Sequence, residues 1–311
     1  MHVTVSLFIL TQYKTKKEWE IEFKLIYIDI LKKVKSYDEL AAINEDCLNQ
    51  FKSEYTIDNN SIEFLPAYFN FIECFLAQND KIGEVKKYLI VGLTNLLNAS
   101  KKKDESSKYR QEYSTNEYDE EEVNKKLLQS RLDLLFARFN ILTRAPNEAI
   151  EKLTSSIITY SEIYGPESVG LTPQYYYLAD YFLDMGMGDD KKEKRRKIVV
   201  KNIYLKIADM WKMYFLGMVN PLFLSNDDQD LILAIGETYV KLIANRIGST
   251  FRDSETELEL KFKMIKVIIL KRTNSDIYEK ALENVLDLKK KIEDKIIDKE
   301  YIEEMAEEMK N

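Results

Sequence analysis

The side-chain types that most often carry catalysis are scarce in this sequence. Its 311 residues include one histidine, His2, and two cysteines, Cys47 and Cys74. A Ser-His-Asp or Cys-His arrangement needs a histidine held in a pocket, and the second residue of a chain is a poor place for one. The nine glycines form neither a dinucleotide-binding fingerprint nor a phosphate-binding loop. We therefore expect a protein that is not an enzyme and that binds no cofactor.

The acidic residues and the thiols have the chemistry of metal ligands but not the spacing. A calcium loop needs alternating oxygen ligands, a central glycine and a closing glutamate, and residues 226–230 lack the last two. Carboxylate pairs such as Glu303-Glu304 have the type for acid–base catalysis, but we expect them on solvated helix faces. The two cysteines show no metal-binding pattern and favour a reducing compartment. The sequence therefore predicts no metal site.

The composition favours a helical protein. Only 9 glycines and 5 prolines are present, too few for the turns of a β-sandwich or an α/β sheet. The net charge of −7 disfavours binding to a phosphate backbone. No apolar run reaches the roughly 18–20 residues of a membrane span, and residues 1–10 lack the basic start and cleavage site of a signal peptide. We expect an all-α, cytoplasmic protein that binds neither nucleic acid nor membranes.

Apolar residues recur at three- and four-residue steps over most of the chain, which predicts a series of helices. Pro146 predicts a helix start, and Gly165-Pro166 predicts the end of the same helix. Helices joined by short turns pack antiparallel in pairs, and the stacking of successive pairs closes the core of a solenoid. The expected helices span residues 17–34, 36–51, 61–75, 82–97, 123–142, 146–164, 172–183, 196–213, 228–246 and 257–272, with a last long helix over 275–309.

One stretch interrupts this pattern. Residues 101–126 contain 15 charged side chains and no Leu, Ile, Phe or Met, so they bury too little apolar surface to offset the entropy of ordering. We interpret them as a charged, disordered insertion, which is either a partner-binding or modification segment or a tolerated surface loop. The expected organisation is therefore N-terminal helical pairs over 1–100, this insertion, the best-defined pairs over 127–220, and a C-terminal pair with a long terminal helix over 221–311.

The best-defined pairs resemble a known repeat. Ala149 and Leu153, the turn Gly165-Pro166-Glu167, and the run Tyr176-Tyr177-Leu178-Ala179 before Phe182 resemble the long variety of tetratricopeptide repeat. The resemblance implies a right-handed solenoid in which small residues let helices approach and large ones fill the gaps. The sequence departs from the pattern at Ser168-Val169, where His-Pro is usual, and in the charged run 186–196.

A second resemblance extends over residues 80–290 and is specific around 160–215. Tyr176-Tyr177-Leu178-Ala179 and Lys206-Ile207-Ala208-Asp209-Met210-Trp211-Lys212-Met213-Tyr214 look like the repeat region of the ciliary proteins that carry a MYND zinc finger. The family implies an axonemal protein linked to a single-headed inner-arm dynein, with dynein heavy or light chains and a second tetratricopeptide protein as partners. Its finger uses seven cysteines and one histidine, which this chain lacks.

Three groups of residues are candidates for contacts with a partner. The first group is aromatic, and aromatic residues are enriched at interface hot spots, although the same residues fit a repeat core. The basic run suits an acidic partner such as a tubulin surface, or is a solvated turn. The terminal stripe either caps the solenoid, which we expect for residues 278–292, or meets a partner helix, which we expect for residues 296–309. The candidates are Tyr175, Tyr176, Tyr204, Trp211 and Tyr214; Lys191, Lys192, Arg195 and Arg196 of the run 191–197; and Ile296, Ile302 and Met305.

From these features we expect a non-catalytic protein-interaction scaffold located in the cilium and axoneme, with a cytoplasmic pool. The resemblance implies an adaptor for an inner-arm dynein. The alternative is a general tetratricopeptide co-chaperone or trafficking adaptor that captures an extended peptide.

Overall fold

The computed structural model describes residues 65, 69, 72–73, 76, 82–107, 120–184, 190–218, 226–251, 256–273, 275 and 277–310. Within these ranges all regular structure is helical and no strand occurs, which confirms the expected all-α class. The chain divides into two compact units, residues 1–143 and 144–311. The expected helices at 17–34 and 36–51 lie outside the described residues, as do His2, Cys47 and Cys74.

The first unit contains α5 (Ile82–Ser107) and α6 (Glu120–Leu142), which pack against each other. Their core includes Leu89 and Leu132, together with residues from the segment that precedes α5. Both helices extend into the predicted insertion: residues 101–107 and 120–126 are helical, and 108–119 lie outside the described residues. Lys and Glu are good helix formers and can extend a helix beyond its apolar face, so the two helices reach into this stretch. The disordered insertion stays a prediction.

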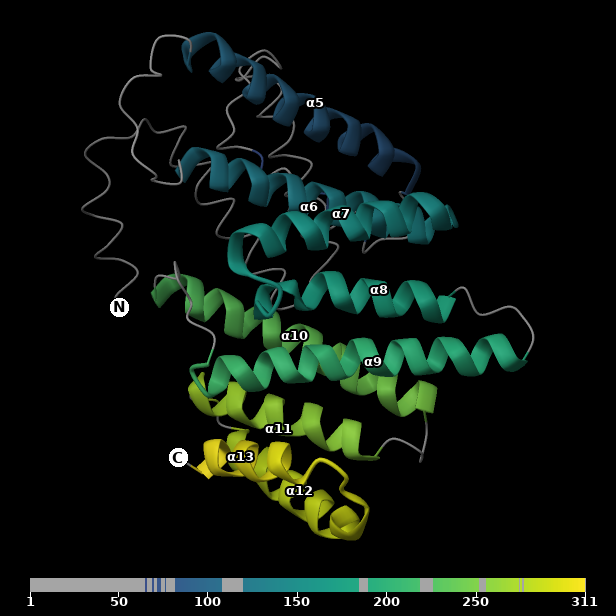
Figure 1. The fold of residues 1–311 in the computed structure, drawn as a ribbon, viewed down its shortest axis with the longest axis vertical. Coiled ribbons are helices and arrows are strands. Elements are labelled where there is room, and N and C mark those ends of the chain that lie inside the picture. Colours follow the sequence, from purple (N-terminus) through teal and green to yellow (C-terminus); the bar gives the residue numbers. More distant parts are fainter. Residues whose placement is uncertain are drawn as a thin grey trace. The chain divides into compact units, whose positions relative to one another are not determined.

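The second unit is built from successive helices that stack in pairs (Figure 1). Within it, α8 packs on both α9 and α10, while α11 packs on α9, α10, α12 and α13. The hairpin α8–α9 therefore lies on the hairpin α10–α11. The elements are α7 (Pro146–Tyr164), η3 (Val169–Leu171), α8 (Thr172–Asp184), α9 (Asp190–Phe215), α10 (Asn226–Phe251), α11 (Thr256–Arg272), α12 (Tyr278–Ile292), η5 (Glu293–Lys295) and α13 (Lys299–Lys310).

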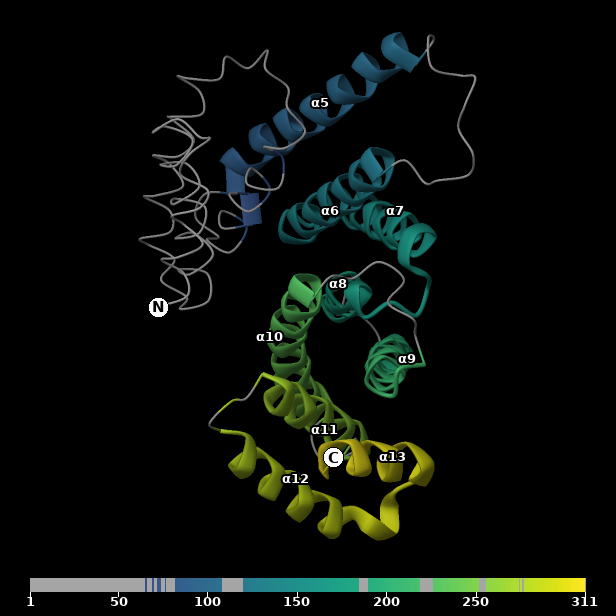
Figure 2. The ribbon, with the colours of Figure 1, turned by 90° about the vertical axis from the view of Figure 1, so that its left-hand side faces the viewer.

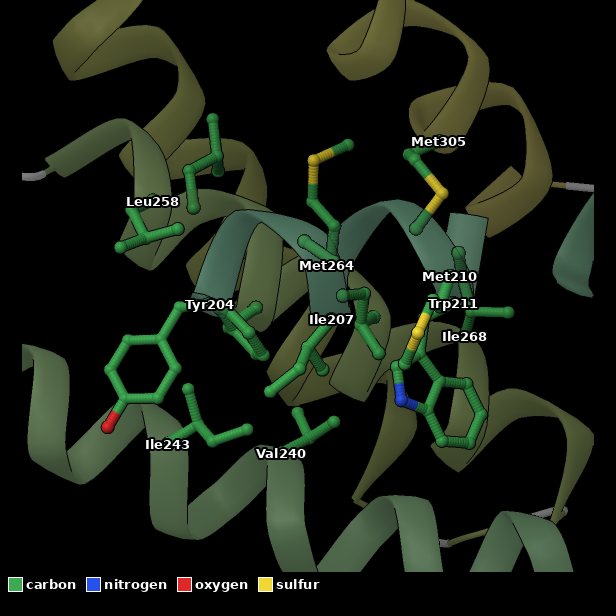
Figure 3. Packing of buried hydrophobic residues seen from close by; sticks show 14 of the residues in the cluster. Tyr204, Ile207, Met210, Trp211, Val240, Ile243, Leu258, Met264, Ile268 and Met305 are labelled. Atoms are coloured by element: carbon green, nitrogen blue, oxygen red, sulfur yellow. The ribbon is translucent and has the colours of Figure 1, made fainter. Parts of the chain in front are cut away.

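The centre of this unit is α11, which is buried on nearly every face. Its residues from Leu258 to Leu270 are buried, apart from the half-buried Glu259, Lys263 and Lys266. Its apolar residues lie on more than one side, so they need neighbours on several sides, and α9, α10, α12 and α13 all pack against this helix. Figure 3 shows how side chains of α9, α10 and α13 meet those of α11 in one cluster.

The helix boundaries follow from residues with special backbone requirements. Pro146 begins α7, and Gly165 ends it with a φ of 84°, so both predicted signals are confirmed. Gly217 follows α9 with a φ of 66°. There the N–H of Met218 donates to the carbonyl of Met213 (2.9 Å) and the N–H of Gly217 donates to that of Tyr214 (3.2 Å), which is a Schellman motif.

The predicted long helix over 275–309 is wrong. The chain leaves α12 at Ile292, passes through η5 and folds back, so that α13 lies beside α11 and α9 (Figure 2). A straight helix over those residues would be ~50 Å long, against ~25 Å for α11. About half of its apolar stripe would then extend beyond the helix that covers it, whereas the break lets α12 and α13 both pack on α11.

Candidate protein-binding surface

The structure places most of the predicted aromatic contacts in the interior. Tyr204 and Trp211 are fully buried and Tyr176 is nearly so, whereas Tyr175 and Tyr214 are half-buried. The expectation that the first three face a partner is therefore corrected: they form the core between the two stacked hairpins. Helical spacing alone cannot separate an aromatic residue that faces the next pair from one that faces a partner.

Trp211 is fixed by contacts with two other helices. Its Nε1 donates to Oγ1 of Thr172 at 3.1 Å, and that hydroxyl donates to the carbonyl of Val169 at 2.6 Å. Its ring lies against Gly236 of α10, where no side chain is present. A buried indole usually needs a partner for its N–H, and Thr172 at the start of α8 supplies it.

A charged cluster that sequence reasoning missed joins α8 to α10. Nε of Arg246 lies 3.1 Å from Oδ1 of Asp180. Burial raises the pKa of Asp180 above its ordinary value, although the charge of Arg246 opposes this. Burial and the charge of Asp180 raise the pKa of Tyr176 to about 12. The indication of this cluster in the sequence is Asp180 itself, a carboxylate next to Ala179 on the apolar face of α8. The cluster links two helices and holds its carboxyl group in the interior.

The C-terminal candidates Ile296, Ile302 and Met305 are also buried in the core of the chain. The expectation that they meet a partner helix is corrected, because α13, which carries Ile302 and Met305, folds back onto α9 and α11. Figure 3 shows Met305 in the cluster with side chains of α9 and α11.

Polar contacts fix α13 in this position. Nζ of Lys261, a residue of α11 that is 3% exposed, lies 2.5 Å from Oδ2 of Asp298 and 4.1 Å from the ring centroid of Tyr301. Asp298 caps α13 by accepting the N–H of Tyr301 at 3.3 Å, and the hydroxyl of Tyr301 donates to the carbonyl of Ala208 at 3.1 Å. Burial would raise the pKa of Asp298, but the hydrogen bond and charge of Lys261 outweigh it and lower that pKa. This helix is an integral part of the fold.

The basic run remains exposed, in a different element from the one expected. Residues 191–197 form the first turns of α9 and not a turn between helices. Lys192 and Arg195 are exposed and Arg196 is half-buried, while the side chain of Lys191 lies outside the described part. We call residues 190–199 the basic projection. It is the candidate protein-binding surface, because it combines these cations with exposed aliphatic side chains at Ile198 and Val199.

The described residues contain no group of His, Cys, Asp and Glu that could hold a metal ion. Among the helices described, none combines the length and the apolarity needed to cross a membrane. No family model and no curated protein matches this chain.

Proposed function

We propose that this chain is a non-catalytic scaffold that binds other proteins on a stack of helix pairs. The observation that carries this proposal is the stacking of hairpin α8–α9 on hairpin α10–α11, with α8 against α10 and α9 against α11. In helical repeat proteins each pair likewise leaves an apolar face that only the next pair covers, and the exposed surfaces of the stack bind partners.

The residues that resemble a tetratricopeptide repeat support this proposal by their packing. Ala149, Leu153 and Ala179 are fully buried, as the close approach of neighbouring helices requires. The departure from a regular repeat lies in helix length, because α8 has 13 residues and α9 has 26. The additional turns of α9 include the basic projection.

The location and the partners that we propose rest on the resemblance of residues 160–215. They are the ciliary axoneme, where the chain would connect a single-headed inner-arm dynein with a second tetratricopeptide protein. The alternative, a co-chaperone or trafficking adaptor, shares the scaffold but differs in its partners, so an experiment that identifies partners in place distinguishes the two.

The test is crosslinking mass spectrometry on intact ciliated cells that express the tagged full-length chain. We expect crosslinks to inner-arm dynein subunits, and recovery of the chain with extracted axonemes. Recovery only from cytosol without dynein subunits would overturn the axonemal proposal, and crosslinks to chaperones would favour the alternative. A chain that crosslinks to no other protein would contradict the scaffold itself.

A further inference from the structure

We infer that the basic projection, residues 190–199 of α9, binds an acidic amphipathic helix of a partner protein. This inference rests on the proposed scaffold function and names the chemistry of one partner. It starts from the packing of α9, whose two ends differ. The described side chains from Lys192 to Val199 are all exposed or half-buried, whereas Val200, Tyr204 and Ile207 are fully buried. In Figure 1 the same end of α9 runs past the end of α11.

A helical segment that extends beyond the core of its unit gains little stability from packing. Short helical segments in water are marginal unless an apolar face packs on something, and the basic projection packs on little within its unit. Lysine and arginine side chains near a helix start also interact unfavourably with the helix dipole. Residues that lower the stability of their own helix are expected at functional positions. The basic projection contains such unfavourable residues over at least two helical turns.

The charge of this segment is opposite to that of the rest of the chain. Residues 190–197 contain six basic and two acidic side chains, a net charge of +4, which leaves −11 on the other 303 residues. Glu193 is engaged by Lys197 at 2.9 Å. In the described part of the chain, Lys192, Lys194 and Arg195 have neither an ion pair nor a side-chain hydrogen bond. Their charges are available to an anionic group from outside.

Arg196 adds a donor that lacks an acceptor. Its Nη1 is buried and has no hydrogen-bond partner. An unsatisfied buried donor costs free energy, and a guanidinium is best satisfied by a carboxylate in a two-pronged contact. A change of side-chain rotamer that exposes this nitrogen would let an incoming Asp or Glu side chain supply the missing acceptor.

The exposed aliphatic residues decide between classes of anionic partner. Ile198 is 59% exposed and Val199 38%, and each follows Arg195 by three or four positions, so apolar and basic side chains share one face. A phosphate backbone has no apolar group that could contact Ile198. Two aliphatic residues are too few for a helix that lies in a membrane surface. An acidic helix that carries its own aliphatic side chains matches both features.

The experiment measures binding of a fluorescein-labelled helical peptide to the full-length chain by fluorescence anisotropy. The peptide has about 18 residues, with Glu and Leu on one face at spacings of three and four. We expect saturable binding that weakens when NaCl rises from ~0.1 M to ~1 M, where the Debye length falls from about 10 Å to about 3 Å. The variant K192Q/K194Q/R195Q should bind at least tenfold more weakly, and Ile198→Ser should also weaken binding.

Matched controls separate this site from charge in general. K289Q/K290Q/K291Q removes the same charge from α12 and should bind the peptide as the unaltered chain does. Unchanged peptide binding by K192Q/K194Q/R195Q would overturn the inference. The inference would also be overturned if poly(U) RNA or phosphatidylserine vesicles bound as tightly as the peptide and K192Q/K194Q/R195Q abolished that binding. A dimer that is seen in sedimentation and is abolished by this variant would overturn it as well.

The crosslinking experiment keeps this inference separate from the proposed function. If the unaltered chain and K192Q/K194Q/R195Q show the same crosslinked partners at the basic projection, the inference fails while the scaffold stands. If neither chain crosslinks to any protein, the scaffold fails. Circular dichroism checks that the variant is folded, which we expect because all three altered side chains are exposed.

Discussion

The indole of Trp211 in α9 lies directly on the backbone of Gly236 in α10. A Cβ built on Gly236 would lie 2.2 Å from Cη2 of the indole, far inside van der Waals contact. Trp211 cannot easily move away, because it is fully buried and its Nε1 donates to Thr172. The stacked hairpins therefore meet at a position where only a hydrogen atom fits.

This contact predicts opposite effects for two alanines in the same helix. Gly236→Ala should lower the free energy of unfolding by about 1–3 kcal/mol, because overpacking outweighs the better helix propensity of alanine. Gly248→Ala, where nothing lies within 4 Å, should raise it by about 0.5–1 kcal/mol. Urea unfolding followed by Trp211 fluorescence in a Trp19→Phe background measures both. Equal stabilisation by the two substitutions would contradict the packing.

The buried lysine of α11 predicts an asymmetry between the two halves of one ion pair. Asp298→Asn keeps a helix-capping side chain but leaves the ammonium of Lys261 without its nearest carboxylate, since Glu257 lies 4.0 Å away. Asp298→Asn should lower the free energy of unfolding by about 1–3 kcal/mol. This loss is below the range for fully buried pairs because Asp298 is itself 46% exposed.

Lys261→Met is the matched change on the other side of the pair. It removes the buried charge and leaves a carboxylate that water reaches, so it should cost less than Asp298→Asn. The comparison uses the same urea experiment. A larger loss for Lys261→Met would mean that the ion pair itself, and not the burial of an unpaired charge, dominates the attachment of α13.

Two buried tyrosines differ in whether their hydroxyl is satisfied. The hydroxyl of Tyr204 is buried without a hydrogen-bond partner, whereas that of Tyr301 donates to the carbonyl of Ala208 at 3.1 Å. Tyr204→Phe should therefore raise the free energy of unfolding, by up to ~1 kcal/mol, and Tyr301→Phe should lower it by about 1–2 kcal/mol. Thermal or urea unfolding of the two variants checks the difference in sign. Losses of equal size would show that the Tyr204 hydroxyl has a partner, such as a bound water.

The carboxyl of Asp180 predicts a pH dependence. Its folded-state pKa lies above the ordinary value of 3.8, so between that value and the raised pKa the folded protein binds more protons than the unfolded chain. Stability from this group therefore falls as pH rises through that window. Asp180→Asn should remove the fall. Unfolding free energies of the two proteins from pH 4 to pH 7 test this, and parallel profiles would contradict it.

Local features of the sequence determined the helices but not all of their ends. Three- and four-residue apolar spacing located α7, α8 and α11 to within one residue, because that spacing follows from 3.6 residues per turn. Pro146 and Gly165 punctuated α7 through their own backbone restrictions. The stripe from Tyr278 to Met309 also has helical spacing, yet the chain breaks inside it. The break is stabilised by Glu257 of α11, whose carboxylate accepts the N–H groups of Ile297 and Asp298 at 2.9 and 3.2 Å.

The sequence by itself determined the all-helical class and the exposed basic run, because composition, periodicity and a dense block of charge are local properties. Only the tertiary structure decided which candidate residues face solvent. Trp211 is buried because Gly236 and Thr172, distant in sequence, form its site, and Met305 is buried because α13 folds back onto α11. Burial depends on which helices stack together, and that choice is made by contacts between residues far apart in the chain.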